Sequence, residues 1–453
     1  MIRRYLPHFT TLRVVFLLYA AIAISLLGHK PLWLDEIWQQ LGTRNVPFHQ
    51  MVAYARDGAG GALLVHFLQW CVLKALPYSA AVSRIPALVF GAGSVLLSWC
   101  LARQLRVKHR WVVAVLFMAL PILFRYTLEA RPYSEGVFFC CWGLLLLFQL
   151  DERASVPRSL GLLLIAAAGL YSQPFLLFEL LIVALLLAAT HWKNALYFIL
   201  PLLGSVLLYL PWYLSASKQW NNGLSASGGV TVFDAKLPLR VLREYTGGGY
   251  VVGLCFLVLI VVGLRVSGRQ RLKYILAVGF AGGLLVPLLA EQHLQYFYAA
   301  RHLIFALPAG ALLCAFAFET AVKAKAQIVF GILLIASFAT IIAKEIGPHE
   351  NWQATAERLA ELEKKGVCIE SIRPDGMAYY RFFVPLLGEA NCQAEKRKQL
   401  VMVKDPYTPE SLLKARSQQL TREGYEEAHS AKVNEFQLVY FLLRGDQAFA
   451  NSK

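Results

Sequence analysis

The chain has 453 residues, of which 57% are hydrophobic and 16% are charged, and its formal net charge is +16. A soluble domain carries roughly 25% charged residues. Apolar runs of near-spanning length recur from residue 12 to residue 343, so the composition predicts a polytopic α-helical membrane protein. Residues 344–453 contain 16 basic and 16 acidic residues, so the positive excess lies among the membrane segments. That distribution favours cytoplasmic anchoring and an anionic ligand, and it excludes a nucleic-acid partner.

The first apolar run, residues 12–28, follows arginines and no Ala-x-Ala cleavage site comes after it, which is typical of a signal anchor with a cytoplasmic N-terminus. Basic clusters at 103–110, 265–273 and 323–325 mark cytoplasmic loops. With these constraints we expect about eleven spans, which places the C-terminal residues on the outer face. The spans are expected at residues 12–28, 85–102, 111–124, 134–150, 159–171, 174–190, 195–214, 250–266, 274–290, 301–318 and 327–343.

The apolar segment 62–77 does not fit this order, because a crossing there would place the basic cluster at 103–110 outside. The segment is short for a span and contains His66, Gln69 and Lys74. We therefore expect a juxtamembrane helix along the outer leaflet. For His66, a hydrogen-bonded polar group in this helix is the plainer interpretation, and a substrate contact is the alternative.

Two adjacent carboxylates, Asp35 and Glu36, follow the first span directly and are flanked by Trp33 and Trp38. Tryptophan favours the membrane interface, because its ring is apolar and its N–H is polar. Charges beside a bilayer are costly unless they are solvated, paired or used. The dipeptide is therefore either an ordinary acidic loop or part of a reactive site.

The outer loop from Arg125 to Tyr133 places two arginines, one carboxylate and two tyrosines within nine residues. The guanidinium group is a planar fork that suits phosphate oxygens, and tyrosine rings can stack on a sugar. Interfacial anchoring is the alternative, although such charged groups are rare at a helix junction. The loop is therefore a candidate ligand site, formed by Arg125, Tyr126, Glu129, Arg131 and Tyr133.

A second basic element, Arg301-His302, stands at the expected outer start of a helix. A helix N-terminus favours an anion, and the arginine adds full charge. Snorkelling of the arginine to lipid headgroups is an equal alternative. Metal-ligand spacings such as His-Glu-x-x-His or Cys-x-x-Cys do not occur in the sequence, so it gives no support for a metal site and leaves only a divalent cation open as a cofactor.

Residues 344–453 contain no spanning run and predict a separate small soluble α/β domain after a membrane domain over residues 1–343. Its expected helices are 352–366 and 409–423, its expected strands are 366–370, 399–403 and 436–443, and 379–387 is ambiguous. Cys368 and Cys392 lie in this domain. They would be able to pair outside the cytoplasm, but their spacing does not show that they do.

The order of three motifs resembles the GT-C integral membrane glycosyltransferases, nearest to the branch with protein O-mannosyltransferases and lipid A aminoarabinose transferases. The motifs are Leu34-Asp35-Glu36 after the first span, Glu129-Ala-Arg-Pro-Tyr133 and Arg301-His302. This resemblance implies inverting transfer of a sugar from a polyprenyl-phosphate donor to a lipid, glycan or protein acceptor. The reaction would take place on the outer face of the inner (plasma) membrane.

The resemblance also implies roles for the residues of these motifs. Asp35 corresponds to the catalytic aspartate of the family, and Glu36 would orient the acceptor or share the proton. Arg131 and Arg301, with Arg125, would hold the donor phosphate. The remaining substrate contacts would come from Glu129, Tyr133, His302, Tyr126 and His66.

Two other classes fit parts of the sequence. A transporter or flippase for a lipid-linked sugar would show inverted repeats and charged midplane helices. The sequence shows no internal repeat, and Glu179 alone interrupts an apolar run in that way. A polysaccharide ligase or polymerase would favour a large outer loop, whereas loop 215–249 is moderate in size.

Overall fold

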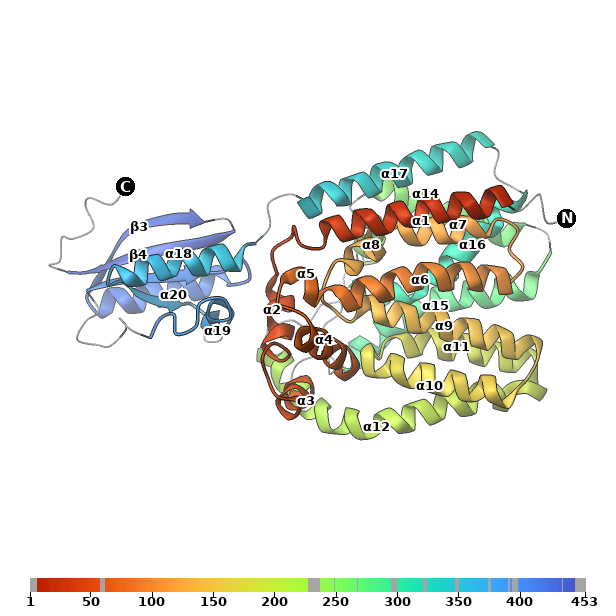
Figure 1. Cartoon of the computed structure of the whole chain (residues 1–453), viewed down its shortest axis with the longest axis horizontal. Helices are drawn as coiled ribbons and strands as arrows, with labels where there is room; N and C mark the ends of the chain where they lie inside the picture. The colour runs from red at the N-terminus through yellow and green to blue at the C-terminus, as the bar shows by residue number, and fades with distance from the viewer. Residues whose placement is uncertain are drawn as a thin grey trace. The chain divides into compact units, whose positions relative to one another are not determined.

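The computed structural model (Figure 1) divides the chain into two compact units. The membrane unit consists of Met1–Gly28 and Gly42–Glu345, and the C-terminal unit consists of His29–Leu41 and Ile346–Lys453. The sequence boundary expected after residue 343 stays a prediction, and the segment His29–Leu41 groups with the C-terminal unit. The structure describes residues 6–57, 62–226, 237–247, 249–266, 268–294, 300–320, 324–346, 350–373, 376–389, 392, 398–433 and 435–444.

The described residues of the membrane unit form helices joined by short connections. They are α1 (Leu6–Leu26), α3 (Phe48–Asp57), α4 (Leu63–Ala75), α5 (Ala80–Ser83), α6 (Ile85–Gln104), α7 (Arg110–Ala119), α8 (Pro121–Thr127), α9 (Tyr133–Glu152), α10 (Val156–Ser172), α11 (Leu176–Thr190), α12 (Ala195–Ala226), α13 (Leu237–Tyr245), α14 (Tyr250–Arg265), α15 (Gln270–Leu294), α16 (Leu307–Thr320) and α17 (Ala324–Ile346). Two 3-10 helices, η2 (Trp192–Asn194) and η3 (Ala300–Ala306), precede α12 and α16.

Six of the described helical segments are long and apolar enough to cross a membrane: α6, α9, η2 with α12, α15, η3 with α16, and α17. A seventh span results if α7 and α8, which are bent by 63° at their junction, are counted together. The bend lies where Pro121 begins α8 and Leu120 is extended, because proline disfavours helical backbone in the residue before it. The expected count of about eleven spans is therefore not confirmed, since α10, α11, α14 and the apolar part of α1 are shorter.

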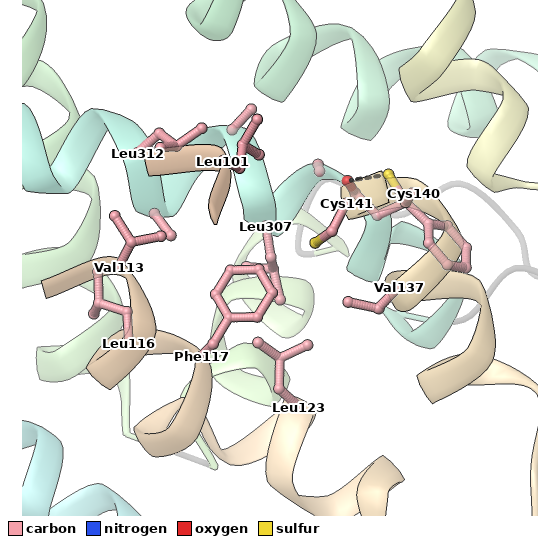
Figure 2. Close-up of a cluster of buried hydrophobic side chains, with 14 of the residues drawn as sticks. Leu101, Val113, Leu116, Phe117, Leu123, Val137, Cys140, Cys141, Leu307 and Leu312 are labelled. Carbon is pink, nitrogen blue, oxygen red and sulfur yellow. Dashed lines mark hydrogen bonds between the residues drawn. The ribbon is translucent and has the colours of Figure 1, made fainter. Parts of the chain in front are cut away.

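The core of the membrane unit surrounds α16, whose residues are almost all buried. Gly263 of α14 faces the backbone of α16, and an added Cβ would clash with the carbonyl of Leu313. A small residue here lets the two backbones approach closely, as in other membrane helix pairs. Figure 2 shows part of this core, where α6, α7, α8, α9 and α16 contribute apolar side chains. The thiol of Cys140 donates to the carbonyl of Phe305 at 3.6 Å, which ties α9 to η3.

The C-terminal unit contains a four-stranded mixed sheet in the order β1-β2-β4-β3. β1 and β2 are parallel, with Ile369 opposite Val401, and the other pairs are antiparallel. The described elements are α2 (Leu34–Leu41), α18 (Trp352–Lys364), β1 (Cys368–Ser371), α19 (Gly376–Arg381), β2 (Gln399–Lys404), α20 (Glu410–Arg422), β3 (Tyr425–Val433) and β4 (Phe436–Leu443). The expected helices and three expected strands of this region are present.

The sequence missed β3, and its composition explains why. Most side chains of β3 are exposed, and it pairs only with β4 at the edge of the sheet. Its residues therefore lack the apolar alternation that marks a half-buried strand. Cys368 and Cys392 form a disulfide in the structure, which the spacing left open.

Candidate functional site

The two adjacent carboxylates of α2 have different surroundings. Glu36 is buried, and its Oε2 accepts a hydrogen bond from the backbone N–H of Trp33 at 3.4 Å. This is one half of a capping box, in which the third residue of a helix reaches back to the residue that precedes it. Asp35 is only partly buried. Of the two, Asp35 is therefore the carboxylate that keeps contact with solvent, while Glu36 stabilises the start of the helix.

The N-terminal turn of α2 has a further partner that no sequence motif indicated. The backbone N–H of Leu34 donates to Oε1 of Glu350 at 3.4 Å. Glu350 belongs to the same unit and lies just before α18. No pattern in the sequence links two positions that are 316 residues apart, so only the folded structure reveals this contact.

In the membrane unit, the junction of α8 and α9 holds the candidate loop in a tight turn. Arg125 Nε donates to Oε1 of Glu129 at 2.8 Å, and the Glu129 side chain is fully buried. The N–H of Arg131 donates to the carbonyl of Glu129 at 2.7 Å. Ser134 of α9 donates to the carbonyl of Tyr126 at 2.8 Å. These bonds fix the two arginines of the loop relative to each other.

Segments 125–133 and 301–302 converge on one aromatic cluster. The rings of Tyr126 and Tyr133 have centroids 4.5 Å apart, and the guanidinium of Arg301 lies 5.9 Å from the Tyr133 ring centroid. The ring of His302 lies 6.3 Å from Tyr133 and stacks on Phe175 at 4.7 Å with an interplanar angle of 7°. Two stretches that the sequence separates by some 170 residues therefore form one cluster of cations and rings, in which Tyr126, Tyr133 and His302 are buried.

The helical context of Arg301 differs from the expectation. Arg301 and His302 lie in η3, and the regular helix α16 begins only at Leu307. Arg301 and His302 therefore do not stand at the N-terminus of an α-helix, as expected for an anion site. Arg301 contacts the ring of Tyr133 and His302 stacks on the ring of Phe175 instead.

Three carboxylates balance the charge of this cluster, and the sequence had connected only Glu129 with it. Glu244 of α13 lies within electrostatic range of Arg125 and Arg301. Glu345 of α17 lies within electrostatic range of Arg125. The sequence could have connected Glu244 and Glu345 with this cluster, because both lie next to apolar runs on the expected outer face. The arginines therefore form part of a charged network and do not only face lipid headgroups.

His66 of α4 lies near the same network. Its Nδ1 bonds to the carbonyl of Ala62 at 2.9 Å, which agrees with the plainer interpretation of a hydrogen-bonded polar group. It also lies within electrostatic range of Arg131. Its predicted contact with substrate stays a prediction.

No three His, Cys, Asp or Glu side chains within the described ranges lie close enough to hold a metal ion.

No protein-family profile and no curated protein sequence matches the chain, but solved structures do. ArnT from Cupriavidus metallidurans in the apo state superposes with a TM-score of 0.62 at 10% identity, over 96% of this chain and 98% of that protein. ArnT bound to undecaprenyl phosphate gives 0.60 at 10% identity, over 95% and 98%. The Archaeoglobus fulgidus oligosaccharyltransferase in complex with Zn and sulfate gives 0.52 at 11% identity, over 92% and 72%. At such identities the similarity establishes the fold.

Proposed function

We propose that this chain, whose fold is that of the GT-C membrane glycosyltransferases, is an inverting glycosyltransferase. It transfers a sugar from a polyprenyl-phosphate donor to a lipid, glycan or protein acceptor. Both the donor and the chain are embedded in the membrane, so the carrier's isoprenoids stay in the bilayer throughout. A transporter or flippase, or a polysaccharide ligase or polymerase, is the alternative.

The convergence of Arg125, Arg131 and Arg301 with a cluster of aromatic rings is the observation that carries this proposal. Charged groups beside a membrane are costly, and their retention marks a functional site by default. An anionic lipid phosphate with an attached sugar matches both the cations and the rings. The structurally similar ArnT has been solved with undecaprenyl phosphate bound, which supports a ligand of this class.

In the proposed reaction an acceptor hydroxyl attacks the anomeric carbon of the donor sugar from the face opposite the phosphate. The bond from the acceptor oxygen to that carbon forms as the carbon–phosphate oxygen bond breaks, and the hydroxyl proton passes to Asp35. Asp35 suits this role because its carboxylate is partly exposed. Glu36 holds the helix start and so fixes the backbone beside Asp35.

The leaving group is a lipid phosphate monoester, so the reaction needs positive charge at the phosphate instead of a general acid. Arg131 and Arg301 supply that charge in this proposal. Arg125, whose Nε lies 2.8 Å from Glu129, is the third arginine of the proposed phosphate site. The rings of Tyr133 and His302 contact the sugar, together with Tyr126, Glu129 and His66.

The C-terminal unit lies outside the cytoplasm in this proposal, as in a multi-pass protein of the inner (plasma) membrane. The Cys368–Cys392 disulfide supports that side, because disulfides persist in oxidising compartments. A reporter fused after Lys453 is expected to be accessible only from outside. A cytoplasmic reporter would contradict both the sidedness and the count of spans.

The transporter alternative rests on Glu179, which is fully buried in α11 against Gly279 and Gly283 of α15. A proton-coupled carrier would use such a group near the midplane. A carrier moves the lipid-linked sugar without breaking a bond, so a chemical assay separates the two functions. A ligase or polymerase breaks the same bond but elongates a glycan.

The experiment uses the purified full chain in lipid nanodiscs. Undecaprenyl phosphate is first titrated and its binding followed by native mass spectrometry. A panel of undecaprenyl-phosphate hexoses and pentoses is then incubated with cell-envelope extracts, and released undecaprenyl phosphate is quantified. Release that depends on an extract and yields a single glycosyl addition supports the proposal. Movement of intact donors across a vesicle membrane with no release would establish the carrier instead.

A further inference from the structure

Glu350 connects the start of α2 to the C-terminal sheet domain. Its Oε1 accepts hydrogen bonds from the backbone N–H of Leu34 at 3.4 Å and from the hydroxyl of Tyr407 at 2.9 Å. Its Oε2 accepts from the indole Nε1–H of Trp352 at 3.1 Å. One carboxylate therefore joins three segments that lie far apart in the sequence but belong to one unit.

On the domain side of this connection, Trp352 belongs to the buried core. The Trp352 side chain is fully buried, and its ring lies 4.8 Å from the Phe436 ring and 5.1 Å from the Tyr380 ring. The backbone N–H of Tyr407 donates to the side chain of Asp405 at 2.8 Å. Because the Trp352 ring is packed in the core and Asp405 holds the backbone of Tyr407, the two hydrogen bonds to Glu350 attach its carboxylate to the domain.

On the other side, α2 depends on such contacts for its position. It has eight residues, and helices this short are not stable in water by themselves. The first N–H groups of a helix have no partner within it. Here the N–H of Trp33 is satisfied by Glu36 and the N–H of Leu34 by Glu350, and negative charge at this end is also favourable for the helix dipole.

Asp35 follows Leu34 directly, so the hydrogen bond at Leu34 fixes the backbone from which the Asp35 carboxylate projects. The two carboxylates also lie within electrostatic range. Burial raises the pKa of Glu350, hydrogen bonds from Tyr407, Trp352 and Leu34 oppose this shift, and the charge of Asp35 adds to it.

We infer that Glu350 is a positioning residue for Asp35, which it holds by attaching the first turn of α2 to the core of the C-terminal domain. The domain thereby takes part in the reaction by determining where the base stands. This inference rests on the proposed function of Asp35 as the base.

Amide hydrogen exchange of the full chain in nanodiscs tests the connection without any substrate. In Glu350→Ala, the amides of Leu34 and Asp35 are expected to exchange about five- to tenfold faster, as for a lost helix cap. Glu350→Gln keeps an acceptor oxygen and should restore most of the protection. The matched control is Glu361→Ala, which removes an exposed carboxylate of α18 that pairs with Arg358 at 2.7 Å. Unchanged exchange at α2 in Glu350→Ala would overturn the inference.

If Glu350→Ala also speeds amide exchange in β2 and β4, the wild type is compared with Tyr407→Phe instead. This variant leaves the carboxylate in place and removes only its 2.9 Å anchor. Exchange at α2 is then expected to rise about two- to fivefold, as for one lost hydrogen bond, while the strands stay protected. No rise at α2 in this variant would refute the connection.

Kinetics test the consequence for catalysis, with whichever undecaprenyl-phosphate sugar the wild type turns over. In Glu350→Ala we expect kcat to fall about tenfold or more through misplacement of the base, with an unchanged KM for the donor. Normal kcat together with faster exchange at α2 would overturn the positioning role. If the wild type turns over no donor, the glycosyltransferase proposal fails, and the exchange data still decide whether Glu350 holds α2.

Discussion

The role of Arg301 allows a quantitative prediction. Its guanidinium lies 5.9 Å from the centroid of the Tyr133 ring, and its electrostatic reach includes Glu244. Arg301 is one of the arginines that we propose for the donor phosphate. Replacing Arg301 by alanine should therefore weaken binding of undecaprenyl phosphate.

The side chain of Arg301 is partly buried, and this sets the size of the expected loss in binding free energy. A hydrogen bond between charged groups contributes about 1.5–3 kcal/mol. At about 2 kcal/mol the Kd for undecaprenyl phosphate rises roughly 30-fold. Lysine at the same position retains the charge but loses the planar fork, so Arg301→Lys should recover part of the loss.

The assay is a titration of undecaprenyl phosphate into nanodisc-embedded variants, read by native mass spectrometry. Arg103→Ala is the matched control, because Arg103 is an exposed arginine at the end of α6 outside the cluster. Thermal unfolding of each variant shows that the fold is intact. An unchanged Kd in Arg301→Ala, with a wild type that binds, would refute the assignment of the phosphate to this cluster.

Three further outcomes are expected. Asp35→Asn should lower kcat about 100- to 10,000-fold, as for loss of a general base, with unchanged binding of undecaprenyl phosphate; near-normal turnover would exclude Asp35 as the base. Trp352→Ala should destabilise the C-terminal unit by about 3–5 kcal/mol, since the ring is fully buried, and pulse proteolysis of the full chain measures this. Because burial raises the pKa of Glu350, the stability that its neutral form contributes is present at acid pH and is lost as the pH rises through the raised pKa. Glu350→Gln should remove this dependence of stability on pH. Thermal unfolding of the wild type and the variant between pH 4 and pH 8 measures it, and an equal dependence in both proteins would contradict the prediction.

Several local features could be predicted from the sequence because they depend on neighbouring residues. Apolar runs predicted a helical membrane protein, and the order of three short motifs predicted the GT-C fold. The strands β1, β2 and β4 were predicted because they are apolar. β3 was missed because it is a polar edge strand. The expected count of about eleven spans is not confirmed, since α10, α11, α14 and the apolar part of α1 are shorter than a full span.

The properties of the site that depend on long-range packing came only from the tertiary structure. Sequence alone did not reveal the cap at the start of α2, where folding buries Glu36 and leaves Asp35 partly exposed. No role for Glu350 could be predicted from the sequence. The sequence by itself determined which residues carry charge and which segments are apolar, since both are properties of local composition. Only the packing of distant segments decided that Arg301 meets Tyr133 and that Leu34 meets Glu350, because such contacts form through burial of surfaces that no local pattern encodes.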